Sequence, residues 1–167
     1  MNDEYFMEKA LELAEKAEKK GEVPIGALIV KNEKIISKAF NKREKRQNAL
    51  YHAEILAINK ACKKLKSWRL DDCVLYCTLE PCIMCSGAIV NARIQKVVFG
   101  AYEKKSGAVV SKYSLLNDNG LNHNCLFLGG IKEEECKTLL VNFFQKQRRT
   151  EKTKKLKSQE NIAKKLK

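Results

Sequence analysis

The chain has 167 residues, 44% of them apolar, which suffices for one buried core and does not require a second domain. Thirty-three Lys and Arg against twenty Asp and Glu leave a net charge of +13, which favours a polyanionic partner, nucleic acid first and anionic membrane second. Apolar runs such as 25–30 fall far short of the roughly 18 residues of a membrane-spanning helix. The first residues, Met-Asn-Asp-Glu, lack the features of a secretory signal, so we expect a cytoplasmic protein without a membrane partner.

Hydrophobic spacing predicts helices that alternate with strands. In chain order the expected elements are a helix over 6–17 that stops at Gly21, strands 25–30 and 35–40, a helix over 53–65, strand 73–78, a helix over 82–91, strands 96–100 and 125–128, and a helix over 133–147. Segment 102–124 is rich in Gly, Ser and Asn, which is typical of a functional loop. The pattern indicates a layered α/β domain with about five strands.

The charge is concentrated at the C-terminus. Residues 146–167 hold ten basic and two acidic residues, or +8, and residues 1–145 carry +5. We therefore divide the chain into a domain over 1–149 and a basic tail over 150–167, which is either a helical extension or disordered and cannot fold alone. A solvated end and an RNA-contacting arm are both open for this tail.

Two of the seven cysteines have the spacing of metal ligands. Cys82 and Cys85 follow Pro81, which suits the first turn of a helix, so both sulfurs lie on one helix face near its positive end. His52 would complete three protein ligands, the number that a catalytic zinc ion uses while water takes the fourth position. His123 could instead serve as a fourth ligand and close the site, as in structural zinc centres.

Glu54 favours the catalytic interpretation. A carboxylate two residues after His52 can lie beside the metal without binding it, take a proton from water whose pKa zinc lowers toward about 7, and return that proton to a leaving amine. This chemistry is hydrolytic removal of an amine from an electron-poor ring. The five remaining cysteines are assigned to the core, and Trp68 to packing or to anchoring a loop. Those five cysteines are Cys62, Cys73, Cys77, Cys125 and Cys136.

Together these motifs resemble the cytidine deaminase-like superfamily and, within it, the bacterial tRNA-specific adenosine deaminases. The resemblance reaches to about Arg149. It is carried by Glu22–Ala27, Asn41, His52-Ala53-Glu54, Thr78–Cys85, Arg93-Ile94, Val97–Ala101, Ser106-Gly107, Asn122-His123 and Phe143-Phe144. The sequence departs from the family at Glu103, where Asp is frequent, and at Asn124, where Arg is common.

The resemblance implies a three-layer α/β/α sandwich with a central mixed sheet of about five strands. It further implies a homodimer with one zinc ion per subunit, held by His52, Cys82 and Cys85, with Glu54 as the catalytic proton shuttle. The implied reaction converts adenosine to inosine at the wobble position of the anticodon stem-loop of a tRNA, with tRNA-Arg the expected substrate. The implied substrate-binding residues are Val23, Ile25, Asn41, Ala53, Glu80, Pro81, Glu103, Asn122 and His123.

Three alternatives are open. A deaminase of the same fold could act on free guanine, cytosine or a nucleoside, although such an enzyme gains little from a charge of +13. A zinc-stabilised RNA-binding module would use His123 as its fourth ligand and need no catalysis. A membrane-surface protein is the weakest alternative, because the basic tail lacks a Trp or Phe anchor.

Overall fold

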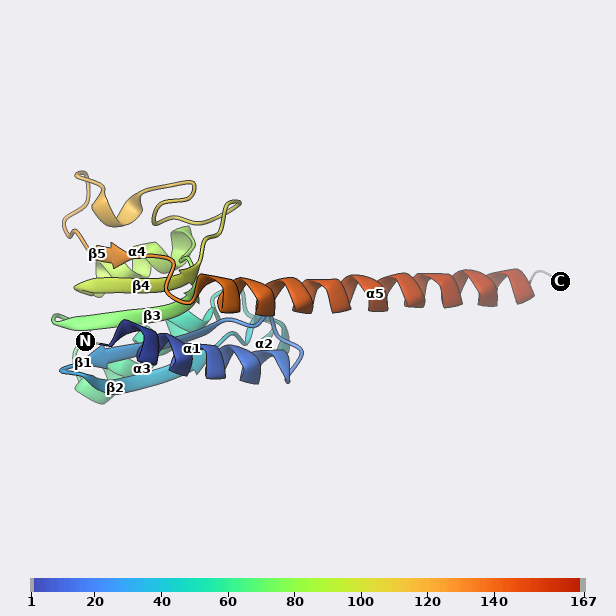
Figure 1. Ribbon diagram of the computed structural model, residues 1–167, viewed down its shortest axis with the longest axis horizontal. Helices are drawn as coiled ribbons and strands as arrows, with labels where there is room; N and C mark the ends of the chain where they lie inside the picture. Colours follow the sequence, from blue (N-terminus) through green and yellow to red (C-terminus); the bar gives the residue numbers. More distant parts are fainter. Residues whose placement is uncertain (1, 166–167) are drawn as a thin grey trace.

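The protein is described by a computed structural model that covers the backbone of residues 2–165 and the side chains of residues 2–159. All five expected strands are present, and each begins or ends within one residue of its predicted bounds (Figure 1). The elements are α1 (Asp3–Glu18), β1 (Gly26–Lys31), β2 (Lys34–Phe40), α2 (Arg43–Arg46), α3 (Ala53–Leu65), β3 (Cys73–Leu79), α4 (Ile83–Asn91), β4 (Lys96–Ala101), the 3₁₀ helix η1 (Leu115–Asn117), β5 (Leu126–Leu128) and α5 (Glu133–Lys165).

The strands form one mixed sheet in the order β2-β1-β3-β4-β5. β1 is antiparallel to both β2 and β3, whereas β3, β4 and β5 are parallel. This arrangement brings the start of β1, the end of β2 and the carboxyl ends of β3 and β4 to the same edge of the sheet. The loops that leave this edge are therefore neighbours in space although they are far apart in sequence.

Side chains alternate between the two faces of the sheet, as the pleat of a strand requires. Ile29, Leu75 and Val97 belong to the apolar cluster that includes α3 and α4. Their sequence neighbours Leu28 and Val98 belong to a second cluster, on the side of α1 and the first turns of α5. Helices thus cover both faces, and the expected three-layer α/β/α sandwich is confirmed.

Close packing of α1 on the sheet depends on small residues at the contact. Ala10 and Ala14 are fully buried on the inner face of α1. Gly26 lies directly beneath them, and a Cβ atom there would collide with the carbonyl oxygen of Ala10 and lie 2.7 Å from the backbone nitrogen of Ala14. The start of β1, and with it this end of the sheet, can approach α1 because position 26 has no side chain.

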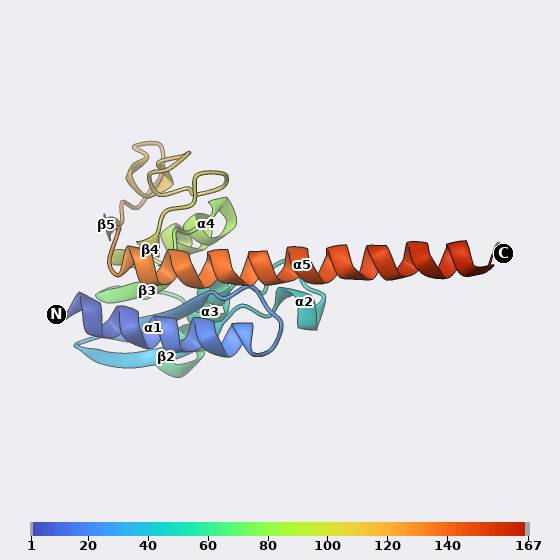
Figure 2. The ribbon, with the colours of Figure 1, turned by 45° about the vertical axis from the view of Figure 1, so that its right-hand side comes forward.

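The main departure from the predicted elements is the length of α5. The helix does not end near Gln147 but continues through the basic tail to Lys165, and it extends far beyond the sheet in both views (Figures 1 and 2). No Gly or Pro follows Gly130, and the tail is rich in Lys and other good helix formers, so nothing in its sequence stops the helix. The short helices α2 and η1 were also not expected. The division at residue 149 stays a prediction, since no change of secondary structure marks it.

Within residues 2–165, no helix combines the length and the apolar character needed to cross a membrane. The helix α5 is long enough but is densely charged.

Replacing Gly26 with Ala is expected to lower the free energy of unfolding by about 1–3 kcal/mol, because the added methyl group overpacks against the backbone of α1. Gly87→Ala is the matched control, since a Cβ atom at Gly87 meets nothing within 4 Å and the residue is helical. That variant should be neutral or more stable by up to about 1 kcal/mol. Urea unfolding followed by circular dichroism measures both, and equal stabilities would contradict the packing argument.

Candidate active site

His52, Cys82 and Cys85 come together where two helices begin. His52 is the N-cap residue of α3, Cys82 is the N-cap residue of α4, and neither side chain forms a capping hydrogen bond. The Nδ1 atom of His52 lies 3.7 Å from Sγ of Cys82 and 3.6 Å from Sγ of Cys85. Tetrahedral zinc with its usual bond lengths to nitrogen and sulfur would place those atoms about 3.5 Å apart. The three side chains therefore fit a zinc ion, and they are the only such His, Cys, Asp or Glu cluster among the described residues.

The surroundings favour a thiolate at Cys82. A hydrogen bond from the Cys85 thiol, with a second from His52, lowers the pKa of Cys82 to about 4. The same contact raises the pKa of His52, and the hydrogen bond to Cys82 together with burial raises the pKa of Cys85. The N-terminus of α4 adds its positive dipole end at this position. Cys82 thus ionises first, which is the state in which sulfur binds metal.

Glu54 is buried beside these three residues. It is only 4% exposed, and its Oε2 atom has no hydrogen-bond partner within the described part of the chain. Burial raises the pKa of Glu54, and the neighbouring His52 offsets only part of that effect. A buried carboxyl group with one unpaired oxygen is costly unless a further group occupies the site, and it is suited to carrying a proton.

A cavity of about 320 Å³ opens beside His52 at this edge of the sheet. Four of the predicted substrate-binding residues line it, namely Val23, Ile25, Asn41 and Glu103. Ala53, Glu80 and Pro81 do not line it, and all three are buried. Their contact with substrate stays a prediction, and for Glu80 the structure shows a different use of the side chain.

Asn41 is held in place by Glu22, a residue to which the sequence analysis gave no role. The Asn41 amide donates to Oε2 of Glu22 at 3.3 Å, and the same carboxylate accepts from the backbone N–H groups of Glu44 at 3.1 Å and Lys45 at 2.6 Å. Glu22 is 1% exposed. The Glu22 carboxylate therefore holds both the backbone of α2 and the side-chain amide of Asn41, which lines the cavity.

Glu80 performs a similar task for the loop after β4. Its carboxylate accepts hydrogen bonds from the N–H groups of Glu103 (3.0 Å), Val109 (3.2 Å), Val110 (2.8 Å) and Ser111 (2.9 Å), and from the Ser111 hydroxyl. Burial would raise the pKa of Glu80, but these hydrogen bonds outweigh it and the pKa lies below its usual value. Glu80 thus holds the backbone of Glu103, which lines the cavity, although Glu80 itself does not line it.

Asn122 and His123 are not brought to this cavity. His123 donates through Nε2 to the carbonyl oxygen of Ile94 at 2.8 Å, and Arg93 donates to the side-chain oxygen of Asn122 at 2.6 Å. Both residues precede β5, whose first residue pairs with Lys96 at the start of β4. They therefore lie at the edge of the sheet opposite to the cluster, and His123 is not part of the metal-ligating set found among the described residues. Their contact with substrate stays a prediction.

The sequence analysis missed the contribution of α5 to the cavity. Lys137, Leu140, Val141 and Phe144 line it, and Val141 and Phe144 are 43% and 41% exposed. Periodicity predicts a helix over 133–147, but it cannot tell an apolar face that meets the core from one that meets a cavity. Arg43, Leu79, Ala101 and Tyr102 complete the lining.

Four of the five cysteines assigned to the core are buried, and burial raises the pKa of both Cys125 and Cys136 to about 12. Cys62 is the exception, because it lies at the margin of α3 and is only partly buried. Trp68 is 63% exposed and lies over the Arg69 guanidinium, 5.3 Å from the ring centroid, so packing in the core is wrong for it, and the alternative role of anchoring a loop stays a prediction.

Comparison with known proteins finds relatives among the deaminases. The family model of the MafB19-like deaminases matches residues 1–148. The tRNA-specific adenosine deaminase of Bacillus subtilis is 48% identical over 150 residues, which is 90% of this chain and 93% of that protein. A solved structure from studies of A-to-I editing by tRNA:A34 deaminases has a TM-score of 0.79 at 38% identity, covering 81% of this chain and 99% of its own. A guanine deaminase structure from Bacillus subtilis has a TM-score of 0.58 at 43% identity, covering 61% of this chain and 66% of its own.

Replacing Glu80 with Gln should lower the free energy of unfolding by about 2–4 kcal/mol. The NH₂ group of Gln would face backbone N–H groups that now donate to a carboxylate oxygen, and the negative charge that strengthens the remaining hydrogen bonds would be lost. Urea unfolding measures this change, and limited proteolysis within residues 103–113 should become faster. The exposed Glu15 supplies the control, since Glu15→Gln should change stability by less than about 0.5 kcal/mol. An equally small effect of Glu80→Gln would contradict the role given to this carboxylate.

Proposed function

The chain belongs to the family of the tRNA-specific adenosine deaminases, and from that membership we propose that it converts adenosine to inosine at the wobble position of a tRNA anticodon, with zinc as its cofactor. One observation carries the proposal: His52, Cys82 and Cys85 form a three-ligand set with the buried carboxyl of Glu54 beside them. His52 also lines a cavity bounded by Asn41, as a site for a flat polar ring requires.

The ligand set supports zinc as one ion per subunit. Zinc held by these three residues would act as a Lewis acid and would supply a nucleophilic water at neutral pH. Glu54 would carry the first proton of the attacking water to the ring nitrogen of adenine, and the second proton, released from the hydroxyl group then on carbon 6, to the exocyclic amine. The bond from carbon 6 to that amine breaks, ammonia leaves and inosine remains.

The other cavity residues fit an extruded purine. Val23 and Ile25 present apolar surface to the faces of the ring, and the amide of Asn41, fixed by Glu22, offers one donor and one acceptor to its polar edge. Arg43 and Lys137 also line the cavity, and the exposed carboxylates beside them, Glu44 at 3.0 Å and Glu134 at 3.9 Å, are partners that a phosphate would replace. An anticodon loop is already single-stranded, so most of the cost of unpairing the target base is avoided.

Three finer points belong to the same proposal. The substrate is a tRNA-Arg carrying adenosine at the wobble position, the enzyme acts as a homodimer, and it works in the cytoplasm. In a homodimer, Asn122 and His123 would contact the substrate that is bound in the cavity of the partner subunit, since they lie at the edge of the sheet opposite to the cavity of their own chain.

A free-base deaminase is the competing function, because the guanine deaminase of Bacillus subtilis shares 43% identity with the matched part. That match covers 61% of this chain, whereas the tRNA:A34 deaminase structure covers 81% with the higher TM-score. The net charge of +13 also favours a polyanion over a neutral base. A structural zinc module is disfavoured because His123 is bound to the carbonyl of Ile94 and does not reach the cluster.

The test is deamination of a tRNA-Arg transcript with adenosine at the wobble position, read as a change from A to G in sequenced cDNA. We expect the zinc-loaded wild type to convert it and Glu54→Gln to be slower by at least about a thousandfold, because the proton carrier is lost. Metal analysis of the same variant should still find one zinc per chain, since Glu54 is not a ligand.

The control is Glu15→Gln, which should match the wild type. Persistent adenosine with zinc-loaded wild-type protein would overturn the proposal, and release of ammonia from free guanine or cytosine instead would establish the competing function. Full activity of Glu54→Gln would refute the role given to that residue.

A further inference from the structure

The second half of α5 forms a basic arm, defined here as residues 145–165. It projects away from the sheet in both views (Figures 1 and 2), and the matched family model ends within its first turn, at residue 148. Residues 146–159 include seven Lys or Arg and a single acidic residue, Glu151. Among the described side chains of the arm, Lys146 is the only one with an ion-pair partner. The arm therefore presents positive charge that the folded domain does not neutralise.

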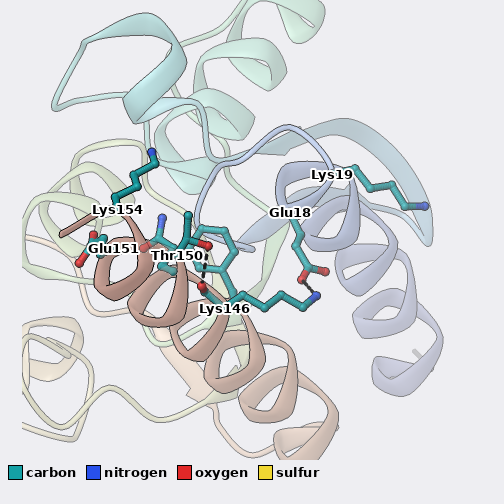
Figure 3. Close-up of a pocket in the computed structure, with 8 residues that line it drawn as sticks. Glu18, Lys19, Lys146, Thr150, Glu151 and Lys154 are labelled. Carbon is teal, nitrogen blue, oxygen red and sulfur yellow. Dashed lines mark hydrogen bonds and ion pairs between the residues drawn. The ribbon is translucent and has the colours of Figure 1, made fainter. Parts of the chain in front are cut away.

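One face of the arm is turned toward α1. Lys146 forms an ion pair with Glu18 at 2.9 Å, and Thr150 and Lys154 line the same groove as Glu18 (Figure 3). This contact marks the face of the arm that is turned toward α1, and it distinguishes the basic residues on that face from the others.

A different face of the arm continues the wall of the active-site cavity. Lys137, Val141 and Phe144 line that cavity, and successive residues of a helix are turned by about 100°. On this geometry Arg148, Lys152 and Lys155 lie within about 80° of the direction of Phe144. Lys154 and Lys157 point on average about 160° away from Lys152 and Lys155, toward the α1 side. The cavity wall thus extends into a row of basic side chains.

We propose that Arg148, Lys152 and Lys155 form a phosphate-binding stripe that holds the RNA backbone next to the nucleotide in the cavity. The proposal rests on the proposed function for the identity of the substrate. From Arg148 to Lys155 the helix rises about 10 Å, and a stacked strand places a phosphate about every 3.4 Å, so the stripe can accompany about three nucleotides.

The composition of this face favours nucleic acid over a protein partner. Between Phe144 and the end of the described side chains, the residues within about 80° of Phe144 are basic or polar and include one acidic residue, Glu151, whereas protein interfaces are anchored by buried aromatic or aliphatic residues. The exposed apolar residue of this stretch, Leu156, lies to one side of the stripe. The long cationic side chains Lys152 and Lys155 are exposed to solvent and free to follow a phosphate backbone.

Two double variants separate a directed contact from general charge attraction. Lys152→Gln with Lys155→Gln removes two charges from the stripe, and Lys154→Gln with Lys157→Gln removes two charges of the same type from the α1 side. The probe is a fluorescent anticodon stem-loop RNA with adenosine at the wobble position, titrated with full-length, zinc-loaded protein and followed by anisotropy at several KCl concentrations. Circular dichroism checks that both variants remain folded.

We expect the stripe variant to bind the stem-loop about tenfold more weakly at 0.1 M salt, with a shallower dependence of log Kd on log salt, because two phosphate contacts are lost. The control variant should stay within about twofold of the wild type. In single-turnover deamination, the stripe variant should need more enzyme for half-maximal rate and keep its limiting rate, since no group at the reacting atoms is altered.

Equal weakening of both double variants would overturn the stripe, because it would show attraction by net charge alone. Wild-type affinity of the stripe variant, or no binding of RNA by the wild type, would also overturn it. If the stripe variant binds RNA more weakly but the wild type leaves the adenosine unchanged, the stripe stands and the proposed function fails.

Discussion

The active site depends on two helix N-termini that meet at one edge of the sheet. The helices α3 and α4 begin with His52 and Cys82, and each of these N-cap residues turns its side chain toward the other helix instead of capping its own. The free N–H groups and positive dipole ends of both helices then act on the same small volume. A thiolate is stabilised there, and the pKa of Cys82 falls to about 4 under the hydrogen bonds from Cys85 and His52. Because α3 packs on β1 and β2 whereas Cys82 and Cys85 follow β3, a change in the register of β1 against β3 would separate His52 from the two cysteines.

Two buried carboxylates hold the rest of the site in place. Glu22 joins Asn41 to the turn of α2, and Glu80 gathers the N–H groups of the loop that contains Glu103. Both carboxylates are almost completely buried, and each is satisfied by several backbone donors, which offsets the cost of removing a charge from water. Glu54 is different, because burial leaves one of its oxygens without a partner. Glu22 and Glu80 therefore position the segments that line the cavity. Glu54, with its unpaired oxygen, is suited to proton transfer.

The strong positive charge of the chain has two distinct locations. Residues 1–145, which form the folded domain, carry a net charge of only +5, whereas residues 146–167 carry +8. Because α5 lines the cavity with Lys137 and Phe144 before it leaves the sheet, the charge of the arm begins at the mouth of the site. A long, rigid helix can carry such charge to a definite place, which a disordered tail of the same composition cannot do.

The sequence by itself determined the five strands and the layered fold, and it predicted the cluster of His52, Cys82 and Cys85 with Glu54 beside it, since periodicity and the His-x-Glu and Pro-Cys-x-x-Cys motifs are local properties of the chain. Only the tertiary structure decided the rest. The two carboxylates Glu22 and Glu80 bond to loops more than 20 residues away, and no local pattern marks such partners. Asn122 and His123 lie at the opposite edge of the sheet because the parallel pairing of β4 and β5 places them there. The face of α5 that meets the cavity is apolar in sequence like the face that meets the core, and only packing distinguishes them.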